Sequence, residues 1–112
     1  MKQNGYWLTR PKVVLVVSLF IHSGRETEFS QFETEAARIM KRYGGQIERV
    51  IRPTASMPSG TVPHEIHLVS FPSTERFEAY RGDADLAQLA SLRQAAIART
   101  EIVFGEEGDP YH

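Results

Sequence analysis

Two histidines in the segment His-Glu-Ile-His, His64 and His67, are the first residues whose types could do chemistry. The metal-protease signature that this segment resembles places its histidines four residues apart on one helix face. Here the offset is three, and on a strand that offset sends the two imidazoles to opposite faces. We therefore predict no metal site. His67 is either a half-buried histidine satisfied by a hydrogen bond or, because it shares a strand face with Val69, a group that titrates in a cavity.

Arg93 is the second candidate, because of its place on a predicted helix. At the angular spacing of an α-helix it falls among the apolar positions Leu89, Ala90 and Ile97. A guanidinium directed into a core needs a carboxylate, backbone carbonyls or an anionic ligand as its partner. Arg93 is therefore either an internally paired arginine or a ligand-pocket residue that binds an anion.

Other motifs give weaker indications. Tyr43 and Tyr80 lie on helix stripes that face the predicted sheet, where an aromatic residue is more often core than proton donor. The tripeptide Arg81-Gly82-Asp83 falls at a predicted helix break. The sequence has no glycine-rich phosphate-binding loop and no nucleophile elbow around a serine. It therefore contains no motif that indicates nucleotide binding or a serine hydrolase.

The elements that must position these residues follow one another as β-α-β-β-α-β. This order predicts an α+β, ferredoxin-like fold with a four-stranded antiparallel sheet. The predicted strands are residues 13–21, 46–52, 64–71 and 100–104. The predicted helices are a long one between Ser23 and Gly44, a short one after Pro72-Ser73, and 84–99.

Local signals fix the helix ends. Ser23 and Glu26 have the spacing of a capping box, and Asp83 can cap the last helix. Gly44 supplies the positive φ that ends the first long helix. Its apolar stripe recurs every three or four residues and comprises Phe29, Phe32, Ala36, Ile39, Met40 and Tyr43.

Length and composition indicate one domain of residues 13–105, with a polar leader (1–12), a loop at 53–63 and a flexible acidic tail (106–112). The chain has 112 residues, no cysteine and a net charge of −1, so we expect neither nucleic acid nor a membrane as its partner. The apolar run 13–21 is far shorter than the roughly 20 residues that span a bilayer. No signal-peptide cleavage site follows that run, and we expect a cytoplasmic location.

The first strand predicts an assembly. Both alternating sets of its side chains are apolar, with Leu15 and Leu19 on one face and Val16 and Phe20 on the other. Two helices cover only one face of a four-stranded sheet, so the second face needs a cover. The simplest cover is a second copy of the sheet, which makes a homodimer. The alternative is that the leader folds back through its apolar cluster at 6–8.

Five short segments occur in a fixed order along the chain: Tyr-Gly-Gly at 43–45, Pro-His-Glu-Ile-His at 63–67, Phe-Pro-Ser at 71–73, Phe-Glu-Ala-Tyr at 77–80 and Leu-Arg-Gln-Ala-Ala at 92–96. Through these segments the chain resembles a bacterial family of dimeric α+β barrel proteins of unknown function. The resemblance implies a ferredoxin-like subunit whose sheet packs against that of a partner. It implies no catalytic residues.

The larger fold superfamily also contains cofactor-independent monooxygenases of the antibiotic-biosynthesis type and haem-degrading enzymes. The haem-degrading kind uses an Asn, a Trp and a His within the barrel, whereas Asn4 and Trp7 here precede the first strand. A different oxidative or isomerase chemistry based on His67, His22 or Tyr80 stays open.

Two functions follow from the sequence. The first is a homodimer that binds a small molecule, anionic if Arg93 is its partner, in a cavity between helices and sheet. The alternative is a small cofactor-independent enzyme, of monooxygenase or isomerase type, acting on an aromatic or polyketide-like substrate. The ligand-pocket candidates are Arg93, His67, His22 and Tyr80, and we expect no metal and no cofactor.

Overall fold

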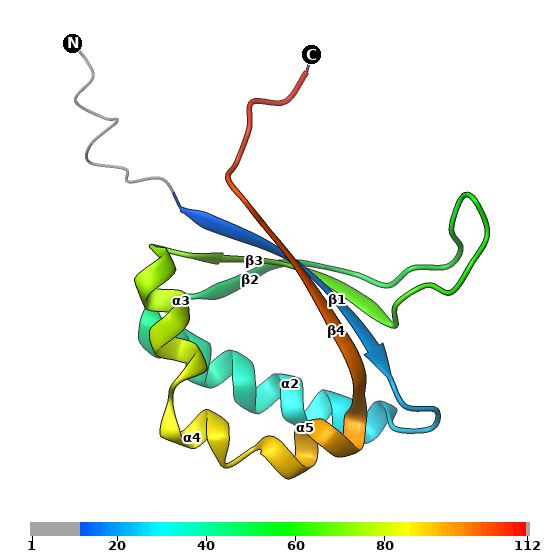
Figure 1. The fold of residues 1–112 in the computed structure, drawn as a ribbon, viewed down its shortest axis with the longest axis horizontal. Coiled ribbons are helices and arrows are strands. Elements are labelled where there is room, and N and C mark those ends of the chain that lie inside the picture. The colour runs from blue at the N-terminus through cyan, green and yellow to red at the C-terminus, as the bar shows by residue number, and fades with distance from the viewer. Residues whose placement is uncertain (1–11, 112) are drawn as a thin grey trace.

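The computed structural model describes residues 12–111 as one sheet with helices on one of its faces (Figure 1). The four strands are antiparallel and lie in the order β2-β3-β1-β4, which confirms the α+β, ferredoxin-like fold. The elements are β1 (Val13–Ile21), α2 (Glu26–Met40), the 3-10 turn η1 (Lys41–Tyr43), β2 (Gln46–Ile51), β3 (Glu65–Phe71), α3 (Thr74–Arg81), α4 (Ala84–Ala87), α5 (Ala90–Ala96) and β4 (Ile97–Gly105).

β1 is the central strand, and it is apolar on both of its faces. Leu15 and Leu19 point toward the helices and are almost completely buried, whereas Val16 on the opposite face is 36% exposed. Leu15 pairs with Val69 of β3, and Val16 pairs with Val103 of β4, so each face continues across the neighbouring strands. The helices therefore cover only one of the two apolar faces.

The core between the layers is built on the predicted stripe of α2. Five of the six predicted stripe residues are buried: Phe29, Phe32, Ala36, Ile39 and Met40. Phe29, Phe32 and Ala36 pack in one cluster with Leu19 and Ile97, and Met40 packs in a second cluster with Leu15 and Phe71. Gly44 ends η1 with a φ of 75°, as its position predicted. These contacts fix α2 against β1 and β3.

The predicted capping box at the start of α2 is wrong. The residue before the helix is Arg25, and no side chain caps the helix start. Gly24 has a φ of 76°, and the backbone N–H of Arg25 donates to the carbonyl of His22, so a tight turn occupies this segment. The turn removes Ser23 from the position that a capping residue needs.

The predicted helix 84–99 is also wrong in its extent. Asp83 does cap a helix start, because its carboxylate accepts from the N–H groups of Asp85 and Leu86 at 2.7 and 3.2 Å. The helix then breaks into α4 and α5, and β4 begins at Ile97 instead of residue 100. Ile97 pairs with Ile21, and the register between β1 and β4 shifts by one residue of β4 at this point. Strand pairing therefore overrides the helical periodicity of this segment.

The long loop between β2 and β3 and the described residues after β4 contain no helix or strand. Residues 53–63 form an irregular loop at one end of the sheet (Figure 1), and residues 106–111 have no regular secondary structure and are exposed. The predicted leader 1–12, with its apolar cluster at 6–8, lies outside the described residues except for Lys12. No helix in the described part of the chain is long and apolar enough to cross a membrane.

Candidate functional site

A cavity of about 500 Å³ lies between the sheet and the helices. Its volume is within the range of about 300–1,000 Å³ that is usual for small-molecule sites. Most of its wall is apolar and comes from β1, β3 and α2, with β4, α3, α4 and α5 on the remaining sides. The polar and charged side chains in its lining are Glu33, His67, Tyr80, Arg81, Arg93 and Thr100.

His67 of β3 is the most deeply placed of these groups, with 4% of its surface exposed. Its Nε2 lies 2.8 Å from Oε1 of Glu65, which is itself buried on the same face of the strand. The second carboxylate oxygen of Glu65 accepts from Nε of Arg52 at 2.9 Å. Glu65 therefore lies between an imidazole and a guanidinium.

The proton positions follow from the charge of Glu65. Burial raises the pKa of this carboxyl, but the hydrogen bonds from His67 and Arg52 outweigh burial, and the net pKa is lowered. An ionised carboxylate can only accept, so Nε2 of His67 carries the proton and donates it to Glu65. In the neutral imidazole the other nitrogen, Nδ1, is then a free acceptor.

Glu33 of α2 lies on the other side of the imidazole. Its Oε1 is 3.7 Å from Nδ1 of His67, and its side chain is 20% exposed. Burial raises the pKa of Glu33 and the charge of Glu65 raises it further, against the lowering effects of His67 and Arg93. Glu33 thus retains its proton to a higher pH than an ordinary glutamate.

Sequence reasoning missed Glu33 as a site residue. The signal that could have found it is its position four residues after Phe29 and three before Ala36, within the apolar stripe. Glu65 was likewise seen only as part of a failed metal motif.

Tyr80 and Arg93 occupy the remaining polar positions of the cavity wall. Burial raises the pKa of the Tyr80 hydroxyl, and the charge of Glu33 raises it further, so this group stays a neutral phenol. Arg93 is exposed, which contradicts the expectation of a guanidinium directed into the core. Because the helix ends at Ala96, Arg93 lies at the rim and donates to Oγ1 of Thr100 at 3.1 Å.

His22 does not belong to the site. It is exposed, it directly follows β1, and it is not among the cavity residues. The structure thus brings together three of the four candidates, His67, Tyr80 and Arg93, and separates the fourth from them.

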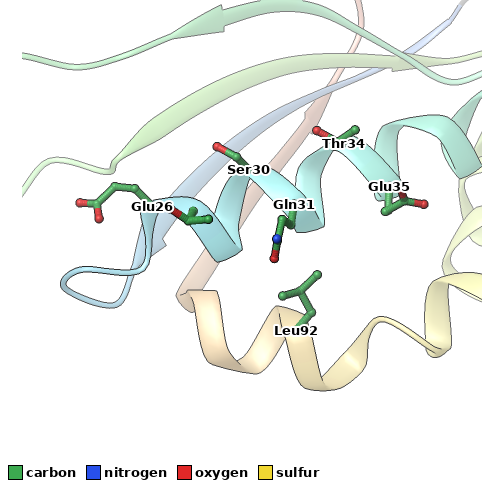
Figure 2. A pocket seen from close by; sticks show the side chains of 7 residues that line it. Glu26, Ser30, Gln31, Thr34, Glu35 and Leu92 are labelled. Carbon is green, nitrogen blue, oxygen red and sulfur yellow. The ribbon is translucent and has the colours of Figure 1, made fainter.

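A groove of about 710 Å³ on the outer side of α2 offers less chemistry, although it is larger. Figure 2 shows Gln31 of α2 and Leu92 of α5 on facing sides, with Ser30 and Thr34 on another side of α2. All but one of its seven lining residues are polar groups of α2, and none of them is buried. The cavity beneath the sheet is therefore the candidate site.

The acidic groups and the imidazole of the cavity do not form a metal centre. Glu65 and Glu33 contact opposite nitrogens of the same ring, so the three side chains do not converge on one point. Among residues 12–111 no group of three histidine or acidic side chains could hold a metal ion. The arrangement instead suits proton transfer.

Comparison with known proteins adds information on the fold. No family model matches the sequence, and no curated protein is similar to it. A solved protein of unknown function from Rhodopseudomonas palustris matches with a TM-score of 0.79 and 12% identity, over 89% of this chain and 85% of that chain. SnoaB from Streptomyces nogalater, a cofactor-independent oxygenase, matches with a TM-score of 0.66 and 13% identity, over 90% and 97%.

A third structure is a dabb family protein with a ferredoxin-like fold from Mesorhizobium loti. Its TM-score is 0.62 at 13% identity, over 92% of this chain and all of that chain. The likeness is one of fold alone. It places this chain among architectures that include both proteins of unknown function and an oxygenase, and it transfers no residue roles.

Proposed function

We propose that this protein binds a small organic molecule in the cavity between the sheet and the helices. The observation that carries the proposal is the buried pair of Glu65 and His67, whose imidazole lines a mostly apolar cavity and faces Glu33 with its second nitrogen. Burying charged groups costs stability, so such a pair is poorly explained by packing alone. A ligand with an apolar body and a polar end matches this lining.

The charges of the cavity restrict where an anionic group could bind. Glu33 and Glu65 lie at the inner end, whereas Arg93 lies at the rim. The ionised carboxylate of Glu65 would repel an anionic group of a ligand, whereas the guanidinium of Arg93 would attract it. We therefore propose that such a group binds beside Arg93.

As a second candidate function, we propose a cofactor-independent enzyme acting on an aromatic or polyketide-like substrate. The specific support is that Glu65 holds His67 in one tautomer and orientation, which a general base requires and simple binding does not. SnoaB, one of the structures of similar fold, is a cofactor-independent oxygenase. The chemistry assigned to this chain is proton removal by His67, with Tyr80 as a neutral hydroxyl in the same cavity.

We also propose that the protein is a homodimer through the uncovered face of the sheet. That face carries Val16, Ile51 and Val103, which are 36%, 39% and 64% exposed. They belong to β1, β2 and β4, and the strand register puts all three on the same face. A second copy of the sheet would remove this apolar surface from water.

Blocking the cavity tests the binding function. Ala90 is exposed and lines the cavity, whereas Ala95 is exposed on the same helix and does not. Nitrobenzene serves as an apolar probe, and its affinity is measured by changes in protein NMR chemical shifts. We expect Ala90→Phe to bind the probe at least tenfold more weakly than the wild type and Ala95→Phe to bind it normally. Equal binding by both variants, or no binding by the wild type, contradicts the proposal.

A further inference from the structure

Two polar atoms at the inner end of the cavity face each other without forming a bond. Nδ1 of His67 and Oε1 of Glu33 are 3.7 Å apart, beyond the roughly 2.7–3.2 Å of a hydrogen bond. Within residues 12–111 neither atom has another hydrogen-bond partner. His67 is buried, and buried polar groups are normally satisfied, so the pair can accept a polar group that is supplied from outside.

The separation of these atoms suits one inserted oxygen. An oxygen placed off their line, at about 2.8 Å from each, makes a hydrogen bond to both. Since Glu33 belongs to α2 and His67 to β3, the two atoms approach a ligand from the helix layer and the sheet layer, respectively.

The protonation of the two atoms decides which oxygen fits. When His67 is neutral, its Nδ1 is an acceptor, because Nε2 donates to Glu65. Burial raises the pKa of Glu33, so its carboxyl keeps a proton that it can donate up to a higher pH than an ordinary glutamate. The pair thus presents one acceptor and one donor at the same point. A hydroxyl group is both donor and acceptor, and it matches them.

A carboxylate or phosphate does not match this point. It has no proton for Nδ1, and it would lie beside the ionised carboxylate of Glu65 and the acidic Glu33. The cationic group Arg93 is at the rim and already donates to Thr100. The inner end of the cavity therefore selects against the anionic ligand that Arg93 alone would suggest.

We infer that Nδ1 of His67 and Oε1 of Glu33 form a two-point receptor for the hydroxyl group of a neutral phenol or enol, whose proton His67 accepts. This inference rests on the proposed binding function of the cavity. In the step, the ligand O–H bond breaks and an N–H bond forms at Nδ1. The resulting imidazolium is balanced by Glu65, and the phenolate or enolate oxygen accepts hydrogen bonds from His67 and from the Glu33 carboxyl.

Three probes of one shape test the receptor: nitrobenzene, para-nitrophenol and para-nitrobenzoate. They are titrated into the full chain at a pH below the pKa of free para-nitrophenol, where that probe is colourless. We expect para-nitrophenol to bind about tenfold more tightly than nitrobenzene and to develop the yellow phenolate absorption when bound. Para-nitrobenzoate should bind no more tightly than nitrobenzene.

Variants of His67 and Glu33 then test the role of each residue in the receptor. In His67→Leu, we expect para-nitrophenol to bind without the phenolate band. Glu33→Leu should lose about tenfold in affinity for para-nitrophenol, whereas Glu33→Gln, which keeps a donor, should lose less than threefold. Glu35→Leu is the control, because Glu35 is a partly exposed glutamate of the same helix outside the cavity.

The outcomes separate this inference from the function on which it rests. Tighter binding of para-nitrobenzoate, or para-nitrophenol bound in the wild type without a phenolate band, overturns the receptor while nitrobenzene binding preserves the cavity proposal. Failure of all three probes overturns both. The comparison of probes in the wild type needs no variant, so it decides the inference even if a substitution at His67 prevents folding.

Discussion

The hydroxyl of Tyr43 donates a hydrogen bond to Oδ2 of Asp83 and thereby joins the end of the first helical segment to the start of α4. Nη1 of Arg42 reaches the same carboxylate oxygen at 3.1 Å. Asp83 also caps α4, and Leu86 and Ala87 of that short helix line the cavity. One buried carboxylate thus holds a side of the cavity in place.

Asp83→Asn should lower thermal stability by several degrees near pH 7. The Tyr43 hydrogen bond lowers the pKa of Asp83, burial opposes it, and the backbone N–H groups and Arg42 lower it further, so the net pKa is below the usual range. A lowered folded-state pKa contributes stability that is present above the unfolded-state pKa and lost as pH falls. Circular dichroism melts at pH 7 and pH 3 should therefore show a difference that shrinks in acid, with Asp85→Asn as the milder control.

Glu33→Gln should have the opposite pH dependence. Because burial raises the pKa of Glu33, the folded state binds its proton more tightly than the unfolded state does. Wild-type stability then falls as pH rises from the unfolded-state pKa through the folded-state pKa. The amide of the variant cannot ionise, so the variant should gain stability relative to the wild type between pH 4 and pH 8 in urea titrations. A constant difference across that range would refute the buried acid.

Gly45→Ala should destabilise the protein by about 1–3 kcal/mol through overpacking. A Cβ at this position would overlap the ring of Phe71 and the side chain of Met40, both of which are buried core residues. Gly105→Ala is the matched control, because nothing lies within 4 Å of its added Cβ. We expect its change in the free energy of unfolding to stay within about 0.5 kcal/mol. Equal effects of the two substitutions would contradict the packing at Gly45.

Val103→Lys should convert the proposed homodimer into a monomer. Val103 is 64% exposed on the uncovered face, so the substitution is tolerated by the fold but places a charge in the interface. Light scattering should give about twice the chain mass of 12.7 kDa for the wild type and a single chain mass for the variant. Ala95→Lys, on the helix side, should remain dimeric. A wild-type mass of one chain at micromolar concentration would exclude the dimer.

His67→Gln should separate binding from catalysis. The amide of the substituted side chain can still donate to Glu65, but it cannot accept a proton as an imidazole can. If the protein is an enzyme that uses oxygen, consumption of oxygen with hydroquinone substrates should fall at least a hundredfold in the variant. Nitrobenzene binding should persist. Undiminished oxygen consumption would remove His67 from the chemistry.

The sequence was most informative where structure is local. The apolar stripe of α2, the positive φ of Gly44 and the cap at Asp83 depend on residues a few positions apart, and all of them appear in the structure. The order of elements then restricted the fold to very few topologies.

The sequence was least informative where distant segments meet. Ile97 fits a helical stripe, but its pairing with Ile21 makes it a strand residue and moves Arg93 to the cavity rim. The pKa of Glu33 is raised by burial in the core and by the charge of Glu65 on a distant strand, and no local pattern records either effect. Both errors therefore concern the site, which is assembled from separate elements.

The central position of β1 also affects how the chain reaches its native state. Val17 pairs with His67 on one side and Ile102 on the other, so β1 is synthesised before both of the strands with which it pairs. Until those strands are made, its apolar, β-branched run has no sheet to join, and such segments are prone to self-association. Non-local pairing of this kind slows folding. The strand that organises the finished sheet is therefore also the segment that most needs shielding while the chain is being synthesised.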